Sequence, residues 1–231
     1  MTTPSSTGTA PARFLLLGDS HAGPIGRAAT AAGVPFVGGP VGSGRDFNVG
    51  FHDVRDGALV FRDAAVQERH RGFLAELAVT DLGQLRVPLV STFGLSVHFF
   101  ATGANWRIYR AGDGAFPAGF LTSELFDGIV RAMARGALAF YRHALGLGLR
   151  VLAVLPPQRV PGMSDPLVFA AAQETIRRAL DALGVELVDV RARATDGTGR
   201  QRAAFCEPDD PIHGNLAFGR LIVADLLARG L

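Results

Sequence analysis

The chain has 231 residues, of which 48% are hydrophobic and 19% charged, a size and composition that fit one α/β domain with a sizeable core and are short for two. The formal net charge is only +2 and there is no basic run with interleaved aromatic residues, so we expect no nucleic-acid partner. No stretch approaches the length of a membrane span, and the single cysteine, Cys206, excludes an internal disulfide, so we expect a cytoplasmic protein without a membrane partner.

The N-terminal segment up to residue 12 is rich in Ser, Thr and Pro, and no basic region of the kind that opens a secretory signal precedes the apolar run at 14–17. We therefore expect a disordered tail over residues 1–12. No internal repeat and no domain linker is visible in the remainder, which predicts one domain over residues 13–231. The oligomeric state is left open by the sequence.

The first structured element predicted is a buried strand, Phe14–Leu17, which ends in Gly18-Asp19-Ser20. Pro24 suits the first turn of a helix, so Ser20 lies in the connection between a strand and a helix. Its hydroxyl would be exposed at the carboxyl end of the strand, near backbone N–H groups that can bind an anion. Ser20 is therefore a candidate nucleophile for a reaction that develops an oxyanion.

The loop over residues 38–46 is rich in glycine and could suggest a phosphate-binding loop. It fails the P-loop pattern, because Arg45-Asp46 stand where Lys and Ser/Thr are required, and Phe47 replaces the last glycine of a dinucleotide fingerprint. A turn that needs positive backbone φ angles is the alternative interpretation of these glycines.

Strand and helix patterns alternate through most of the chain. We expect a helix over 25–32, a strand over 34–37, a hairpin over 47–62 with Asp56-Gly57 at its turn, a helix over 64–82, a strand over 87–93, a helix over 122–146, a strand over 151–155, a helix over 167–183, a strand over 185–190, a polar turn over 195–202 and a helix from Asn215 to about 229. This order predicts an α/β fold, a three-layer αβα sandwich with a parallel, flavodoxin-like five-stranded sheet, plus the hairpin and an aromatic-rich loop insertion over 93–120.

A serine nucleophile needs a base that a third group orients, and the chain offers both late, at Asp210 and His213. Gly18-Asp19-Ser20 and Asp210-x-x-His213 together resemble the first and last sequence blocks of the GDSL/SGNH hydrolases. The resemblance implies a serine esterase that forms an acyl-enzyme on a small acyl ester, such as an O-acetylated carbohydrate. In that scheme Ser20 is the nucleophile, His213 the base and Asp210 the acid, with no cofactor and no metal.

The same resemblance implies an oxyanion hole built from the N–H of Ser20 and the N–H of a glycine after the second strand. Gly42 and Gly44 both fit the place of that glycine, and we take Gly44. A short Gly-Asp-Ser-His-Ala match also resembles the SGNH domains of membrane acyltransferases, so an O-acyltransferase is an alternative to the hydrolase.

One block departs from the family pattern. The family follows the third strand with Gly-x-Asn-Asp, whose Asn side chain is the third oxyanion donor, whereas this chain has Gly94-Leu95-Ser96-Val97-His98. Ser96, His98 and Asn105 could replace the missing side chain. We favour His98, because its reach is longer and its ring can donate a hydrogen bond.

Substrate contacts are expected from the aromatic-rich segment and from one loop arginine, with the candidates Trp106, Arg107, Tyr109 and Arg159. The missing asparagine and the many aromatic residues also suit a non-catalytic carbohydrate- or partner-binding domain on the same fold. A metal site at residues 206–213 is disfavoured by its single histidine and mixed ligand set. The α/β-hydrolase motif G-x-S-x-G is absent, because Ala22 stands at its second glycine.

Overall fold

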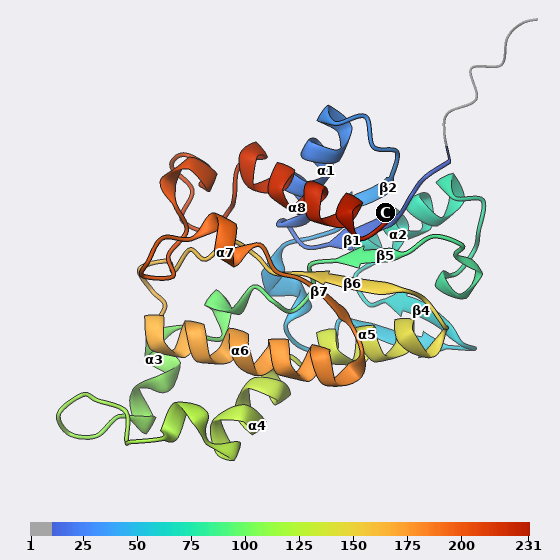
Figure 1. Ribbon diagram of the computed structural model, residues 1–231. Helices are drawn as coiled ribbons and strands as arrows, with labels where there is room; N and C mark the ends of the chain where they lie inside the picture. The colour runs from blue at the N-terminus through green and yellow to red at the C-terminus, as the bar shows by residue number, and fades with distance from the viewer. Residues whose placement is uncertain (1–10) are drawn as a thin grey trace, which may run out of the picture.

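The computed structural model describes residues 11–231, so residues 1–10 of the expected tail lie outside the described residues. A five-stranded sheet with the order β2-β1-β5-β6-β7 runs through its centre, and every neighbouring pair of strands is parallel (Figure 1). The strands are β1 (Leu15–Gly18), β2 (Val37–Pro40), β5 (Leu89–Ser91), β6 (Val151–Val154) and β7 (Glu186–Val188). The predicted α/β fold class is confirmed.

Helices cover both faces of this sheet. The α-helices of the described residues are α1 (Ala22–Ala31), α2 (Ala64–Glu76), α3 (Gly103–Trp106), α4 (Glu124–Met133), α5 (Arg135–Gly146), α6 (Pro166–Leu183), α7 (Arg191–Ala194) and α8 (Leu216–Ala228). The pair α1 and α8 lies on one face, while α5 and α6 lie on the other with α4 outside α6 (Figure 1). No helix within residues 11–231 is long and apolar enough to cross a membrane.

Alternation along the strands builds two separate cores. Leu16 of β1 packs with Ile25 of α1 and Ile222 of α8, whereas Leu15 and Leu17 face the opposite core beneath α5 and α6. Successive side chains of a strand point to opposite faces, so an apolar run without interruption marks a strand that is buried on both sides. Burial on both faces fixes the register of β1, and with it the position of Ser20 just beyond its end.

Several element boundaries differ from the sequence predictions, among them those of the second strand and of two helices. The second strand begins at Val37, not Val34, and includes Gly38, whose φ is 105° and whose added Cβ would lie 2.0 Å from the carbonyl oxygen of Leu16. The helix predicted over 64–82 ends at Glu76, followed by Ala78 at φ 57°. The helix predicted over 122–146 is two helices, α4 and α5, that meet at Ala134.

The break at Ala134 lies next to a close packing contact. Ala134 has φ −91° and ψ 7°, and α4 ends there. The next helix, α5, begins at Arg135, and its second residue, Gly136, lies tightly against the loop before the hairpin. An added Cβ on Gly136 would lie 2.2 Å from the carbonyl oxygen of Val49. The helical spacing of apolar residues continues across this point, which is why the sequence pattern does not reveal the break.

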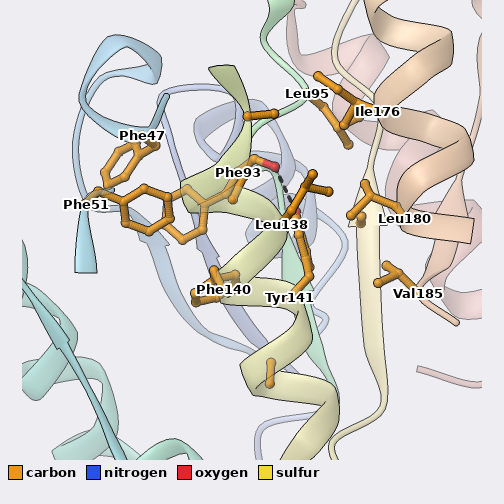
Figure 2. Packing of buried hydrophobic residues seen from close by; sticks show 14 of the residues in the cluster. Phe47, Phe51, Phe93, Leu95, Leu138, Phe140, Tyr141, Ile176, Leu180 and Val185 are labelled. Carbon is orange, nitrogen blue, oxygen red and sulfur yellow. Dashed lines mark hydrogen bonds between the residues drawn. The ribbon is translucent and has the colours of Figure 1, made fainter. Parts of the chain in front are cut away.

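The hairpin is confirmed as an antiparallel pair, β3 (His52–Arg55) and β4 (Ala58–Phe61). Asp56 and Gly57 turn it with φ angles of 52° and 82°, the positive values that a two-residue hairpin turn requires. Phe51, just before β3, packs with its ring centroid 5.2 Å from that of Phe93 in the core next to α5 (Figure 2).

Phe93 also links this core to the candidate site. The hydroxyl of Tyr141, on α5, donates to the carbonyl oxygen of Phe93 at 3.0 Å, the dashed line in Figure 2. Both residues are fully buried. The contact anchors the chain where it leaves β5 and enters the segment that carries Ser96 and His98.

Candidate active site

The carboxyl end of β1 presents Ser20 between the strand and α1, as its strand-to-helix position predicts. Ser20 is partly buried, and the chain turns tightly there, because the N–H of Ala22 donates to the carbonyl of Asp19 at 3.0 Å. The N–H of Gly23 donates in turn to the carbonyl of Ser20 at 3.1 Å. The Ser20 side chain is therefore held by local backbone geometry at the sheet edge where parallel-sheet proteins bind ligands.

The loop before α8 brings His213 to Ser20 across 193 positions of sequence. Nε2 of His213 lies 2.8 Å from Oγ of Ser20, and Nδ1 lies 2.7 Å from Oδ2 of Asp210. A carboxylate only accepts hydrogen bonds, so Nδ1 of His213 carries a proton and donates to Asp210. Nε2 is then free to accept a hydrogen bond from the Ser20 hydroxyl. The three side chains form one continuous hydrogen-bonded chain.

Asp210 is fixed by its own backbone. Its Oδ1 accepts from the N–H of Ile212 at 2.8 Å and from the N–H of His213 at 2.9 Å. Burial acts to raise the pKa of Asp210, but these backbone bonds together with the His213 side chain outweigh it and lower the pKa to about 2. The adjacent Asp209 is exposed at φ 56° and makes no such contact.

Arg159, predicted as a substrate contact, braces the His213 loop. Its Nη1 donates to the carbonyl oxygen of Glu207 and to that of His213, each at 2.9 Å. Arg159 belongs to the segment between β6 and α6, so this side chain ties two crossover connections together at the carboxyl edge of the sheet. One nitrogen of the guanidinium is thereby engaged by two protein carbonyls, and the substrate role of Arg159 stays a prediction.

Gly44, not Gly42, is the glycine next to the Ser20 turn. An added Cβ on Gly44 would lie 3.2 Å from Oδ2 of Asp19 and 3.4 Å from the Cβ of Ser96, whereas one on Gly42 would meet the ring of Phe47 at 2.9 Å. Among the described residues, the N–H groups of Ser20 and Gly44 have no acceptor. Both donors are thus free for a ligand.

The three candidates for the missing asparagine are placed differently. Ser96 is buried and its hydroxyl donates to Oδ2 of Asp19 at 2.7 Å, and Asn105 is exposed on the short helix α3, so neither is available as an oxyanion donor. His98 is 4% exposed, and its Nε2 has no hydrogen-bond partner within residues 11–231. Burial, with a smaller contribution from His21, lowers the pKa of His98 to about 4, so the ring is neutral near pH 7.

Sequence analysis missed the support beneath Ser20. Asp19 is fully buried and accepts from the hydroxyls of Thr92 and Ser96 and from the N–H of His21. A buried carboxylate must be paired or hydrogen-bonded, so an Asp directly after an apolar strand is itself a signal that donors converge on it. The ring of His21 lies against that of His213, with centroids 4.9 Å apart.

The aromatic side chains in the second half of the aromatic-rich segment, from Trp106 to Phe120, pack on one another and on Phe126 of α4. Trp106 is 2% exposed, its Nε1 donates to the carbonyl oxygen of Phe100, and its ring packs on Phe126 with centroids 4.9 Å apart. Tyr109 stacks on Phe120, and Arg107 is exposed beside it. Trp106 thus belongs to an additional packing layer next to α4 and α6, and its substrate role stays a prediction.

An open depression of about 710 Å³ lies beside Ser20. Its walls come from the His213 loop, from α1 and from the first turns of α8, and the lining side chains include Arg27, Glu207 and Arg220. No group of three or more His, Cys, Asp or Glu side chains that could hold a metal ion occurs in the part of the chain that the structure describes.

No protein-family model and no curated protein sequence matches this chain. Similar solved structures include a GDSL-like lipase from Bacteroides thetaiotaomicron (15% identity, TM-score 0.45, 94% of this chain and 86% of that one) and a lipase/acylhydrolase from Enterococcus faecalis (14%, 0.41, 94% and 96%). An acetyl xylan esterase is similar at 12% identity and a TM-score of 0.45, over 94% of this chain and all of that one.

Proposed function

We propose that the protein is a serine-dependent ester hydrolase that works through an acyl-enzyme. The observation that carries this proposal is the hydrogen-bonded chain from Ser20 through His213 to Asp210, which opens onto the depression at the carboxyl edge of the sheet. A nucleophile, a base and an orienting acid within hydrogen-bond reach are the signature of activated-serine chemistry.

In the first half-reaction Oγ of Ser20 bonds to the ester carbonyl carbon, and its proton passes to Nε2 of His213. Asp210 holds the other ring nitrogen and stabilises the imidazolium that forms. The low pKa of Asp210, about 2, keeps this partner ionised at neutral pH. When the tetrahedral intermediate collapses, the bond to the alcohol oxygen breaks and His213 returns the proton to that oxygen.

The oxyanion of the intermediate would be bound by the free N–H groups of Ser20 and Gly44. We assign the third donor to the ring of His98, because this side chain is buried, neutral and belongs to the segment next to Gly44. Donors of this kind are aimed at the charge that develops in the transition state, and each one is worth about 10²–10³ in kcat.

In the second half-reaction water replaces the alcohol. His213 takes a proton from the water, whose oxygen bonds to the acyl carbon, and the bond to Oγ breaks as Ser20 recovers its proton. A small acyl ester, with an O-acetylated carbohydrate as the first case to test, is the substrate class that the sequence resemblance implies.

A covalent probe tests the proposal directly. A fluorophosphonate reagent followed by peptide mass spectrometry should label Ser20 in the folded protein and not in the urea-unfolded protein. Ser20→Ala should lose both the label and the hydrolysis of phenyl acetate, with its thermal transition unchanged. Absence of labelling at Ser20 in folded protein would favour a non-catalytic binding domain and overturn the proposal.

A further inference from the structure

The depression beside Ser20 has a charge pattern of its own. Arg27 on α1 and Arg220 on α8 both line it, on two helices that pack closely enough for an added Cβ on Gly219 to lie 2.1 Å from the carbonyl oxygen of Pro24. The acidic groups in the same wall are Glu207 and Asp210. Both oxygens of Asp210 accept hydrogen bonds from its own loop, from the N–H groups of Ile212 and His213 and from the His213 ring, so Glu207 is the carboxylate of this wall that pairs with a guanidinium group.

The two arginines are only weakly neutralised. Within residues 11–231, Arg220 is exposed and has neither an ion-pair partner nor a side-chain hydrogen bond. Arg27 lies 3.5 Å from Glu207, and the two side chains are 57% and 42% exposed. An exposed pair at this distance contributes little and exchanges readily with a competing anion. One full positive charge, and a second that can be released, therefore face the depression.

The backbone adds to the same sign of charge. Asn215 caps α8 by accepting from the N–H of Phe218 at 3.1 Å, which leaves the N–H groups of Leu216 and Ala217 without acceptors among the described residues. Both residues line the depression. The amino end of a helix carries partial positive charge, so it reinforces the preference of the arginines for an anion.

The depression lies on the leaving-group side of Ser20. Its wall contains Ser20 and His213 but neither Gly44 nor His98, the residues assigned to the oxyanion. In the proposed reaction His213 must reach the alcohol oxygen in order to protonate it. The alcohol half of the ester therefore occupies the side of Ser20 on which His213 lies, which is the side with the two arginines.

We infer that the alcohol half of the substrate carries a negative charge, a carboxylate or a phosphate, which Arg27 and Arg220 bind. This inference rests on the proposed function, because it assigns the two sides of the site from the roles of Ser20 and His213. It adds a substrate class that the triad alone does not define: acyl esters of anionic alcohols.

Three acetate esters with similar leaving groups test it: neutral 4-acetoxybenzamide, 4-acetoxybenzoate and 4-acetoxyphenyl phosphate. After correction for uncatalysed hydrolysis, kcat/KM should be higher for the anionic esters than for the amide. Arg220→Gln and Arg27→Gln should each reduce this preference by about three- to fivefold, mainly through KM, as expected for exposed charge pairs. Added salt should reduce it in the wild type as well.

Two further variants sharpen the test. Glu207→Gln removes the competing carboxylate and should increase the preference for the anionic esters. Arg142→Gln makes the same charge change as the other arginine variants but on α5, across the sheet from the depression. It should leave kcat/KM unchanged for all three esters. A gain confined to the phosphate ester identifies phosphate as the anion, and a gain confined to 4-acetoxybenzoate identifies a carboxylate.

Failure of this inference is separable from failure of the proposed function. If the neutral amide is hydrolysed, Ser20→Ala is inactive, and the arginine variants keep the wild-type preference, the anionic subsite is wrong and the hydrolase stands. If Ser20→Ala hydrolyses all three esters at the wild-type rate, the proposed function itself is wrong.

Discussion

The hydroxyl of Ser96 donates a 2.7 Å hydrogen bond to Oδ2 of Asp19, the residue that precedes Ser20. The other oxygen of Asp19 accepts from the hydroxyl of Thr92 at 2.8 Å and from the N–H of His21 at 3.0 Å. Asp19 is fully buried, so these donors replace water around its carboxylate. The turn that presents Ser20 is thus supported by donors that lie at and just beyond the end of β5.

Ser96→Ala should destabilise the protein by about 1.5–3 kcal/mol, because a buried carboxylate loses a donor that nothing replaces. Equilibrium unfolding in urea measures this change, provided that the dependence of the free energy of unfolding on urea concentration is the same in both proteins. Thr198→Ala, which removes an exposed hydroxyl that donates to Asp196, is the matched control and should stay within about 0.5 kcal/mol of wild type. Equal losses in the two variants would show that the Asp19 network carries no special weight.

The course of the sheet is predictable from sequence because each of its strands has a local signal. Phe14–Leu17 is apolar without interruption and Gly18 ends it, so the strand and the position of Ser20 just beyond its end are predicted together. The start of the second strand is less predictable. Gly38 fits against the carbonyl of Leu16 only in the folded sheet, and the chain nearby gives no sign of that contact.

The contacts of the candidate site are likewise of two kinds, local ones that the sequence predicts and long-range ones that it does not. Asp210 and His213 are three residues apart and contact each other through a local turn, which a short motif can encode. The hydrogen bond between Ser96 and Asp19 and the hydrogen bond from Arg159 to the Glu207 carbonyl join segments that are far apart in sequence. No short sequence motif predicts such contacts. An aromatic side chain in an irregular segment, such as Trp106, is equally suited to packing and to binding, so the sequence does not distinguish the two roles.

His98→Ala should lower kcat for phenyl acetate by about 10²–10³ with KM changed only a few-fold, since an oxyanion donor acts chiefly in the transition state. His98→Gln, whose amide can also donate, should recover part of the loss. Asn105→Ala is the control, because Asn105 is exposed on α3 and should leave both constants unchanged. An unaltered kcat in His98→Ala would leave an oxyanion hole made of backbone N–H groups alone.

Buried histidines should make the fold sensitive to mild acid. Burial, with a smaller contribution from Arg71, lowers the pKa of His70 from 6.5 to about 4, and burial has the same effect on His52 and His98. The unfolded chain then binds more protons than the folded one between about pH 6.5 and pH 4. The contribution of these three histidines to the free energy of unfolding is fully present above pH 6.5 and is lost as the pH falls towards 4.

His70→Phe tests this pH dependence. Both ring nitrogens of His70 lack partners among the described residues, and the ring lies edge-on to Phe61 with centroids 5.1 Å apart, so a phenyl ring suits the site. The variant should be more stable than wild type at pH 5, and its loss of stability between pH 6.5 and 4 should be shallower by up to about 1.4 kcal/mol per pH unit. Parallel stability curves for the two proteins would contradict the assignment.

Arg159→Gln should lower kcat by about tenfold while the protein stays folded. One Nη1 atom holds the carbonyl oxygens of Glu207 and His213, and a displacement of about 1 Å at a catalytic group can cost up to about 10² in rate. Because the brace positions His213 and does not touch the substrate, the rate of fluorophosphonate labelling at Ser20 should fall in parallel with kcat, with KM little changed.

A conservative variant and a neighbouring arginine separate positioning from general effects of charge. Arg159→Lys keeps a donor that can still reach one of the two carbonyls, so it should recover part of the labelling rate. Arg200 is exposed and, together with Arg159, lines a depression other than the one beside Ser20, so Arg200→Gln makes the same charge change without touching the His213 loop. A loss in Arg200→Gln as large as that in Arg159→Gln would mean that local charge, and not the brace on the His213 carbonyl, controls the reactivity of Ser20.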